Sequence, residues 1–122
     1  MTAVFIMLAG GFGALSRFGL DGLIRTRLGR RFPWGTMLIN VSGSFLLGIS
    51  IGFTLHHPEF STLCLIIGTG FCGGYTTFST ASFETVRLME MRQFGRAIFN
   101  ISVTLVLALL IAGLGVTIGS IN

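Results

Sequence analysis

The sequence contains no lysine and few charged residues of any kind. Only 10% of its 122 residues are charged and 52% are hydrophobic, whereas soluble domains carry roughly a quarter of their residues as charges. This composition excludes most soluble folds and favours one small membrane domain. Eight arginines against four acidic residues give a formal net charge of +4. Because the arginines fall between long apolar runs, without interleaved aromatics, nucleic-acid binding is not predicted.

The sequence also lacks the residue clusters that enzymes and disulfide scaffolds need. Its two cysteines, Cys64 and Cys72, would lie roughly 12 Å apart along a continuous helix, which is too far for a disulfide bond. The two histidines are adjacent, at 56 and 57, and far from any cluster of carboxylates or cysteines. No catalytic constellation is therefore predicted, and we do not expect an enzyme.

Charged residues divide the chain into four apolar segments. The runs without Asp, Glu or Arg are 1–16, 32–58, 60–83 and 97–122. A helix needs about 20 residues to cross the roughly 30 Å hydrocarbon core of a bilayer, and the first run reaches this length only by including Arg17 and Asp21. We predict an all-α membrane protein, a single domain over residues 1–122, with transmembrane helices near 3–24, 33–55, 61–88 and 96–118.

Arginines are confined to alternate connections between these helices. Four lie in or near the first connection and three in or near the third, whereas the opposite side, with both termini and the loop 56–59, has none. Because short arginine-rich loops stay in the cytoplasm, we expect a multi-pass protein of the cell membrane with its termini outside and these loops inside. The seven residues are Arg25, Arg27, Arg30, Arg31, Arg87, Arg92 and Arg96.

The second predicted helix carries a polar stripe. Thr36, Asn40 and Ser44 follow one another at four-residue spacing and so lie along one side of the helix. An Asn amide inside a bilayer needs partners and usually faces the bundle interior or a wet cavity. The stripe alone gives equal weight to packing between helices and to the lining of a pore.

Glycine is abundant, with 18 residues spread through the apolar runs. The pairs Gly48 and Gly52, and Gly115 and Gly119, form small-xxx-small faces that let helix backbones approach closely. These faces are compatible both with tight packing inside the chain and with dimerisation. Four helices of this length enclose little by themselves, so a conducting path is expected to need a second subunit.

The third predicted helix contains a run that disfavours a continuous helix. Residues 68–80 include four glycines and repeated Thr or Ser, which lower helix propensity and favour a break near Gly73–Gly74. Carbonyl groups released by a break must be buried in protein, meet water or coordinate a cation. Beyond it, Ser79 and Thr80 offer hydroxyl donors beside Phe78, and uncharged donors suit a path that binds an anion weakly. An intact helix with a glycine-rich packing face is the alternative.

Three motifs are distinctive in combination. They are Gly10-Gly11-x-Gly13-Ala14-x-x-Arg17-Phe18, Gly35-Thr36-Met-Leu-Ile-Asn40-x-x-Gly43-Ser44-Phe45, and Gly70-Phe-Cys-Gly-Gly-Tyr-Thr-Thr-Phe-Ser-Thr80 followed by Glu84. With them the chain resembles the fluoride channel family called Fluc or CrcB along nearly its full length. The resemblance implies an antiparallel dimer with two narrow pores that let fluoride leave the cytoplasm passively. It also implies a structural sodium ion, Na+, at the dimer centre, held by backbone carbonyls of Gly73 and Thr76.

The resemblance further assigns residues to the fluoride path. Phe78 matches the pore phenylalanine of the family, Asn40 its pore asparagine, and Ser79 and Thr80 its polar hydroxyls. The hydroxyl-bearing residues of the second helix and two charged residues take structural or accessory roles by the same comparison. These accessory residues are Arg17, Thr36, Ser44 and Glu84.

The two charged accessory residues have predicted ion-pair partners. Arg17 stands four residues before Asp21, a spacing that allows an ion pair on one helix face, so a structural anchor is expected rather than an anion site. Glu84 is expected near a pore mouth, with Arg87 three residues on as its partner.

The chain departs from the family pattern in its pore wall and in its charge bias. Ala81 stands where relatives commonly have a second phenylalanine, and Ala108 and Ala112 replace hydroxyl residues on the last helix. Homodimers of the family insert in both orientations, whereas seven arginines against none predict one orientation here. We therefore expect an antiparallel partner to be an oppositely oriented homologous subunit, with only one of the two pores fully lined.

Two other functions are compatible with the pattern. A small four-helix drug–proton antiporter has a similar length, but proton coupling usually needs an intramembrane carboxylate, and Asp21 lies near a helix end. A non-conducting partner subunit of a heterodimeric channel is the second. In that case Asn40, Thr76 and Phe78 would be replaceable by apolar residues without effect on fluoride sensitivity.

Overall fold

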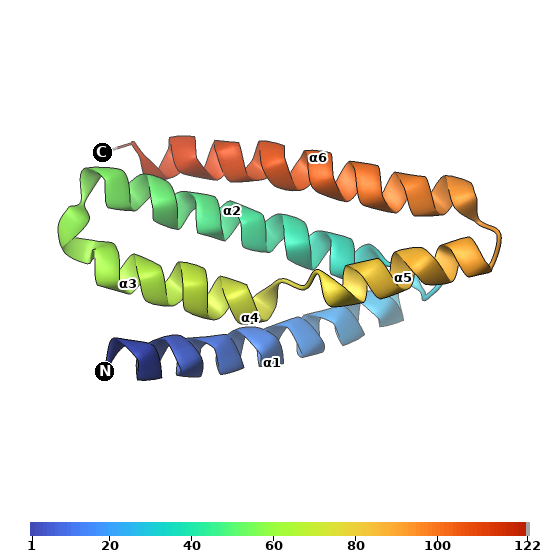
Figure 1. The fold of residues 1–122 in the computed structure, drawn as a ribbon, viewed down its shortest axis with the longest axis horizontal. Helices are drawn as coiled ribbons and strands as arrows, with labels where there is room; N and C mark the ends of the chain where they lie inside the picture. The colour runs from blue at the N-terminus through green and yellow to red at the C-terminus, as the bar shows by residue number, and fades with distance from the viewer. Residues whose placement is uncertain (122) are drawn as a thin grey trace.

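A computed structural model describes residues 1–121, and the chain is helical over most of its length (Figure 1). Three of its helices are long and apolar enough to cross a membrane, and they are α1, α2 and α6. The elements in chain order are α1 (Thr2–Leu28), α2 (Trp34–His56), η1 (Pro58–Phe60), α3 (Ser61–Leu65), η2 (Ile66–Cys72), α4 (Gly73–Tyr75), α5 (Ser79–Glu90) and α6 (Phe94–Gly119).

The third membrane segment is a series of short helical pieces rather than one helix. It runs from α3 through the wider π-helical turns of η2 and the single turn of α4, and it resumes in α5. Residues 76–78 between α4 and α5 are not helical, and Thr76 is extended, with φ −82° and ψ 160°. The predicted all-α membrane fold with a broken third helix is therefore confirmed, but the break begins three residues after the predicted Gly73.

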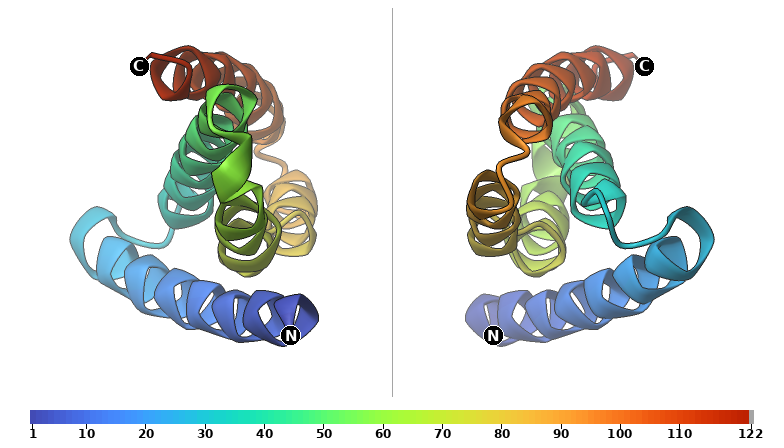
Figure 2. Two further views of the ribbon diagram at one scale, coloured as in Figure 1. Left: turned by 90° about the vertical axis from the view of Figure 1, so that its left-hand side faces the viewer. Right: turned by 90° about the vertical axis from the view of Figure 1, so that its right-hand side faces the viewer.

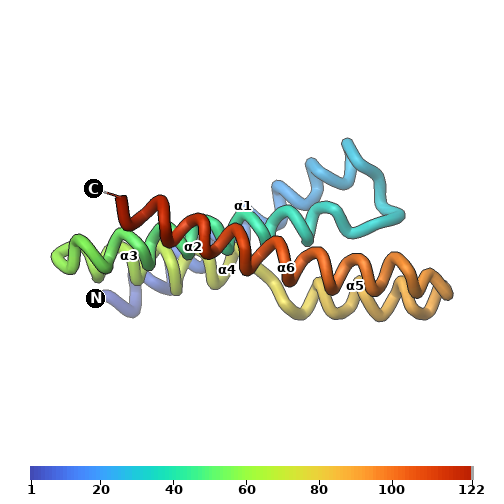
Figure 3. Tube along the Cα trace, turned by 90° about the horizontal axis from the view of Figure 1, so that it is seen from above, coloured from blue at the N-terminus to red at the C-terminus, as the bar shows by residue number. Residues whose placement is uncertain are grey.

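The four segments form an elongated bundle in which neighbours along the chain run in opposite directions (Figure 1). The start of α1, the end of α6 and the turn between α2 and α3 lie at one end of the bundle. The α1–α2 and α5–α6 connections, which carry the arginines, lie at the other end, as the view from above also shows (Figure 3). The alternation of arginine-bearing and arginine-free connections in the sequence therefore places the arginines of these connections at one end of the bundle.

The first helix is longer than predicted at its carboxyl end. The expected end near residue 24 is extended to Leu28, because Arg25 and Arg27 have high helix propensity and their long side chains can leave an apolar surface for water. Gly29 ends the helix with a φ of 83°, a left-handed conformation that costs glycine little.

Glycines set the closest helix contacts. A Cβ atom at Gly48 would overlap the carbonyl oxygen of Ala112, and one at Gly115 would overlap that of Phe45. The small-xxx-small faces of α2 and α6 therefore pack on each other within the chain, which decides between the two alternatives for these four glycines. Gly74 meets Gly10 in the same way, so that α1 crosses the third segment just before the break.

The bundle has a small core and a large apolar surface. The buried cluster consists of Phe32, Met37, Leu88 and Ala97, close to the arginine-bearing end, and most other large apolar side chains are exposed, as suits a lipid surround. The carboxyl half of α1 lies apart from α5 (Figure 2). This oblique crossing leaves space between α1, α2 and the break.

Candidate functional site

The break is held by a single side chain from the neighbouring helix. Asn40 of α2 donates its Nδ2 hydrogen to the carbonyl oxygen of Thr77 at 2.9 Å, and its Oδ1 accepts the N–H of Thr77 at 2.8 Å. Both ends of the amide are thus used on one residue of the break. Asn40 replaces the helical hydrogen bonds that Thr77 lacks, which explains how a polar residue is tolerated at this depth.

The break releases backbone carbonyls that Asn40 does not satisfy. The last bond of the first half joins the N–H of Thr76 to the oxygen of Cys72 at 2.9 Å. In the second half, the N–H of Thr80 turns to the hydroxyl of Thr77 at 3.2 Å. Within residues 1–121, the carbonyl oxygens of Gly73 and Thr76 accept no hydrogen bond. Two such oxygens are suitable ligands for a hard cation.

A groove of about 980 Å³ runs between α2, the broken segment and α6. The term groove refers only to this cavity. Hydroxyl, amide and apolar groups line it, and none of its lining residues is Asp, Glu, His or Arg. The residues from the predicted site that line it are Asn40, Ser44, Gly73, Thr76 and Phe78, and α6 adds Asn100, Thr104 and Ala108.

Two lining side chains of the groove, Phe78 and Thr104, have few contacts among residues 1–121. The side chain of Phe78 is 87% exposed, although it lies in the middle of a membrane segment. The hydroxyl oxygen of Thr104 is buried and has no hydrogen-bond partner among the described residues. The exposed ring of Phe78 is therefore free to contact something that enters the groove or covers it, whereas the Thr104 hydroxyl is an unsatisfied polar group just beneath the groove wall.

A second, smaller cavity of about 270 Å³ lies on the other side of the break. We call it the Arg17 pocket. Its wall includes Arg17, Thr36 and Thr80 from the predicted site. Thr77 lines both this pocket and the groove. Ser79 lines neither and is exposed, so the structure does not bring the two predicted hydroxyls together.

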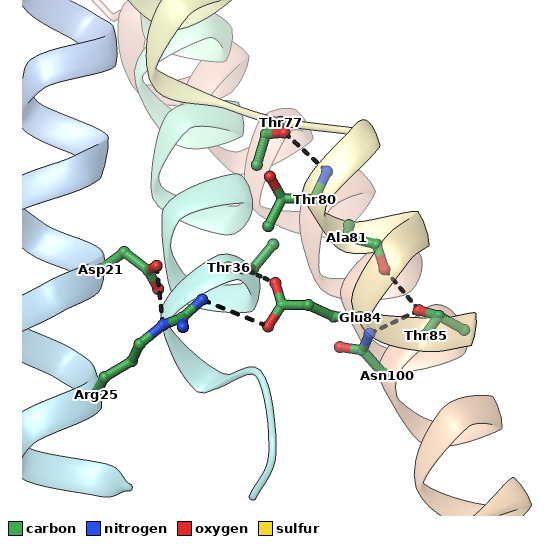
Figure 4. A network of polar contacts seen from close by, with 9 residues as sticks. All are labelled: Asp21, Arg25, Thr36, Thr77, Thr80, Ala81, Glu84, Thr85 and Asn100. Carbon is green, nitrogen blue, oxygen red and sulfur yellow. Dashed lines mark hydrogen bonds and ion pairs between the residues drawn. The ribbon is translucent and has the colours of Figure 1, made fainter. Parts of the chain in front are cut away.

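The charged residues near the Arg17 pocket form a network that differs from the predicted one (Figure 4). Asp21 pairs with Arg25, whose Nε lies 3.0 Å from Oδ2, and not with Arg17. Arg25 also reaches Glu84, with Nη2 4.0 Å from Oε2, and Glu84 accepts a hydrogen bond from the hydroxyl of Thr36. The predicted Arg17–Asp21 pair is thus wrong, and Glu84 is held by α1 and α2 rather than by Arg87.

The geometry explains this exchange of partners. Gly35 leaves room for the Asp21 carboxylate, since a Cβ there would overlap its Oδ1, so Asp21 turns toward the start of α2. Arg25 stands one turn further toward the end of α1 and can reach both carboxylates. Spacing along one helix could not predict this, because Glu84 comes from another segment.

A second polar chain fixes α5 to α6. The buried Asn100 donates its Nδ2 hydrogen to the hydroxyl of Thr85 at 2.9 Å, and Thr85 donates to the carbonyl oxygen of Ala81 at 2.8 Å, as Figure 4 shows. Asn100 and Thr104 stand four residues apart in the sequence and so lie on one side of α6. The part played by Thr85 and by the backbone of Thr77 had no signal in the residue pattern.

These features define a small helical membrane protein whose third segment is broken beside a groove that carries uncharged polar groups, an arrangement typical of ion pathways. The family model described as "CrcB-like protein, Camphor Resistance (CrcB)" matches residues 4–116. The chain belongs to this family, as its three motifs indicated.

Curated relatives support the same assignment. The chain is 46% identical to "Fluoride-specific ion channel FluC 1" of Leifsonia xyli subsp. xyli, covering 99% of this chain and 88% of the relative. It is 53% identical to "Fluoride-specific ion channel FluC 2" of Cutibacterium acnes, over 71% of this chain and 72% of the relative. It is 40% identical to "Fluoride-specific ion channel FluC" of Acidobacterium capsulatum, over 98% and 97%.

Proposed function

We propose that this chain is a subunit of a fluoride-selective channel that lets fluoride leave the cytoplasm down its gradient. The observation that carries the proposal is the groove, which lies at membrane depth and has amide and hydroxyl groups set into a mainly apolar wall without a charged side chain. Such donors replace part of the hydration of an anion without trapping it, as conduction requires. The fluoride-specific relatives support the choice of anion.

Each lining group has a role in this proposal. Asn40 holds Thr77 in the non-helical segment 76–78, which places an amide in the groove wall at the break. Phe78 is unpacked in the chain and can turn the positive edge of its ring toward an anion. The buried Thr104 hydroxyl of α6 has no partner among the described residues and could become a donor only after a small opening of the wall. Fluoride would pass between such weak contacts rather than rest at a fixed charge.

The sodium ion is part of the same proposal. The carbonyl oxygens of Gly73 and Thr76 have no internal partners, and Gly73 is exposed on the groove, so these residues fit a hard cation. Bound sodium would supply positive charge close to the anion path. Two oxygens from one chain are too few for a cation that takes about six ligands, which favours a second subunit at this point.

The partner we propose is an antiparallel, oppositely oriented homologous subunit in the cell membrane. The arginine-bearing connections lie at one end of the bundle, which favours a single orientation with that end in the cytoplasm and the termini outside. An antiparallel copy of this chain would place its arginines on the wrong side. Ala81 and Ala108, both in the groove wall, offer no donor there, which fits one complete pore per dimer.

Efflux from liposomes tests the proposal. Vesicles loaded with fluoride or with chloride are prepared with this chain alone, with a homologous subunit of opposite charge bias, and with both. We expect fluoride efflux with both subunits and little chloride efflux. Absence of fluoride efflux under all three conditions would contradict the channel function. Full efflux with this chain alone would overturn the heterodimer while leaving the channel in place.

A further inference from the structure

Arg92 has a backbone conformation that favours glycine. It follows the end of α5 with a φ of 58°. Its N–H donates to the carbonyl oxygen of Met89 at 3.0 Å, and the next N–H donates to that of Leu88 at 2.9 Å, which is the pattern of a Schellman turn. Glycine is the usual residue at this position, because a Cβ atom is unfavourable there. The chain uses Gly29 in this way at the end of α1, so an arginine at the end of α5 costs stability.

No ion pair among residues 1–121 compensates for this cost. The ion pairs in this part of the chain use Arg25 and His57 and no other basic residue. The side-chain hydrogen bond of the α5–α6 turn joins Arg96 to Gln93 at 3.4 Å and does not include Arg92, which is exposed. A strained residue whose charge has no internal partner indicates a contact outside the chain.

Positive charge is in excess around this turn and the α1–α2 connection. In the Arg17 pocket and its ion network, two arginines are matched by Asp21 and Glu84. Beyond these groups, six exposed arginines at this end of the bundle face one carboxylate, Glu90. Such a surface attracts phosphate groups. The six arginines are Arg27, Arg30, Arg31, Arg87, Arg92 and Arg96.

Aromatic rings lie beside part of this charged surface. Phe99 stands three residues after Arg96 and so on the same side of α6, and its ring centroid lies 5.6 Å from that of the buried Phe32. Phe32 packs in turn on Trp34, with centroids 4.6 Å apart. We call Phe32, Trp34 and Phe99 the aromatic cluster. Trp34 is 38% and Phe99 45% exposed, and tryptophan is enriched where acyl chains meet headgroups, so the cluster favours a lipid over a soluble phosphate.

We infer that the α5–α6 turn and the aromatic cluster together bind an anionic phospholipid. Arg92 and Arg96 contact the phosphate of the headgroup, and the exposed rings of Trp34 and Phe99 contact the acyl chains. Guanidinium groups bind phosphate through paired, charge-assisted hydrogen bonds. This contact offsets the strain at Arg92 and accounts for an arginine at a position where glycine would be unstrained.

Quenching of the fluorescence of Trp34 by brominated lipids tests the site. Trp34 is the only tryptophan of the chain, so the signal reports lipid at the aromatic cluster. The full chain is reconstituted in mixed vesicles of phosphatidylcholine and phosphatidylglycerol, in which one lipid or the other carries brominated acyl chains. We expect preferential quenching by phosphatidylglycerol. R92Q and R96Q should each reduce this preference about threefold, because each removes one arginine from the headgroup.

Two further variants separate the site from general charge and from folding. R27Q removes the same charge from the end of α1, whose carboxyl half lies apart from α5 (Figure 2), and should leave the preference unchanged. R92G should lose the preference as R92Q does, but it should unfold at a higher temperature than the native chain in a neutral detergent, because the strain at this position is removed.

Several outcomes would overturn the inference. Equal quenching by the two lipids in the native chain would exclude a headgroup site, and an equal loss of preference in R27Q would show that charge anywhere at this end is sufficient. An R92G chain that unfolds at the same or a lower temperature would contradict the strain at Arg92. Inorganic phosphate, added against chloride at equal ionic strength, should not compete, and competition would assign the site to free phosphate. None of these measurements depends on fluoride transport, so they test the lipid site separately from the proposed function.

Discussion

Asn40 uses both ends of its amide on Thr77, where the third segment is interrupted. The sequence could show that an amide stood at this depth but not whether it faced a partner or a pore. The structure shows that it faces the backbone of the break and also lines the groove. The two alternatives are therefore not exclusive, because the group that stabilises the break also forms the wall of the groove.

Replacing Asn40 by Ala removes both hydrogen bonds to Thr77. Because a partly buried N–H and carbonyl of Thr77 are then left without partners, we expect a loss of about 2 kcal/mol in the free energy of unfolding. Fluoride efflux should fall about tenfold or more, since the break loses its geometry. The measurements are denaturant unfolding in detergent and efflux from liposomes containing the conducting assembly.

Ser44 provides the matched control for this substitution. It lies one turn further along α2, and its hydroxyl bonds only to the carbonyl oxygen of Asn40 within the same helix. Ser44→Ala should change the stability by no more than about 0.5 kcal/mol. Equal effects of the two substitutions would show that any polar loss on this stripe is harmful and that the bonds to Thr77 are not special.

The helical elements were largely predictable, because long charge-free runs leave few alternatives to membrane helices. The break was predictable in kind from the glycines at 68–74, but its position was not. Gly73 and Gly74 lie in the helical turn α4, and Gly74 makes the close crossing with Gly10. The helical structure ends only where Asn40 supplies Thr77 with other hydrogen-bond partners. The position of the break therefore depends on how α2 packs against the third segment.

The packing of α2 on α6 gives a prediction about whole elements. Gly48→Ala places a methyl group against the backbone of α6 at Ala112, which cannot move aside as a flexible side chain can. We expect a loss of about 2 kcal/mol or more in the free energy of unfolding. Thermal or denaturant unfolding of the purified chain measures it.

Gly113 on α6 offers the opposite case in the same helix. A Cβ atom there meets nothing within 4 Å, so Gly113→Ala should be neutral or should stabilise the protein by about 0.5 to 1 kcal/mol through helix propensity. A comparable loss at both positions would mean that the glycine faces do not act through contact between α2 and α6.

On the scale of the whole molecule, charge is arranged along the bundle rather than across it. The arginine-bearing connections meet at one end, and the turn with Glu59 lies at the other. Site residues, in contrast, separate into the groove and the Arg17 pocket on either side of the break. The sequence predicted the first arrangement because it depends only on the order of segments. It could not predict the second, which depends on how α1 crosses the bundle.

The charge arrangement predicts that orientation controls partnership. The arginines at the end that we propose to be cytoplasmic should hold every copy of this chain in one orientation, which prevents an antiparallel pair of identical chains. Changing exposed arginines to Gln should let a fraction of the copies insert the other way. The chain alone would then gain fluoride efflux. The four positions, all exposed and outside the Arg17 pocket and its ion network, are Arg27, Arg30, Arg31 and Arg92.

Orientation and efflux must be measured on the same samples. A His56→Cys label site, in a background with Cys64 and Cys72 changed to Ser, reports which side of the membrane the exposed α2–η1 turn faces. A membrane-impermeant maleimide should label all copies of the native-charge chain from outside and only part of the neutralised chain. Efflux that appears together with mixed labelling supports control by charge. Mixed labelling without efflux would show that identical chains cannot form the pore even when antiparallel, so the partner must supply lining groups that Ala81 and Ala108 lack.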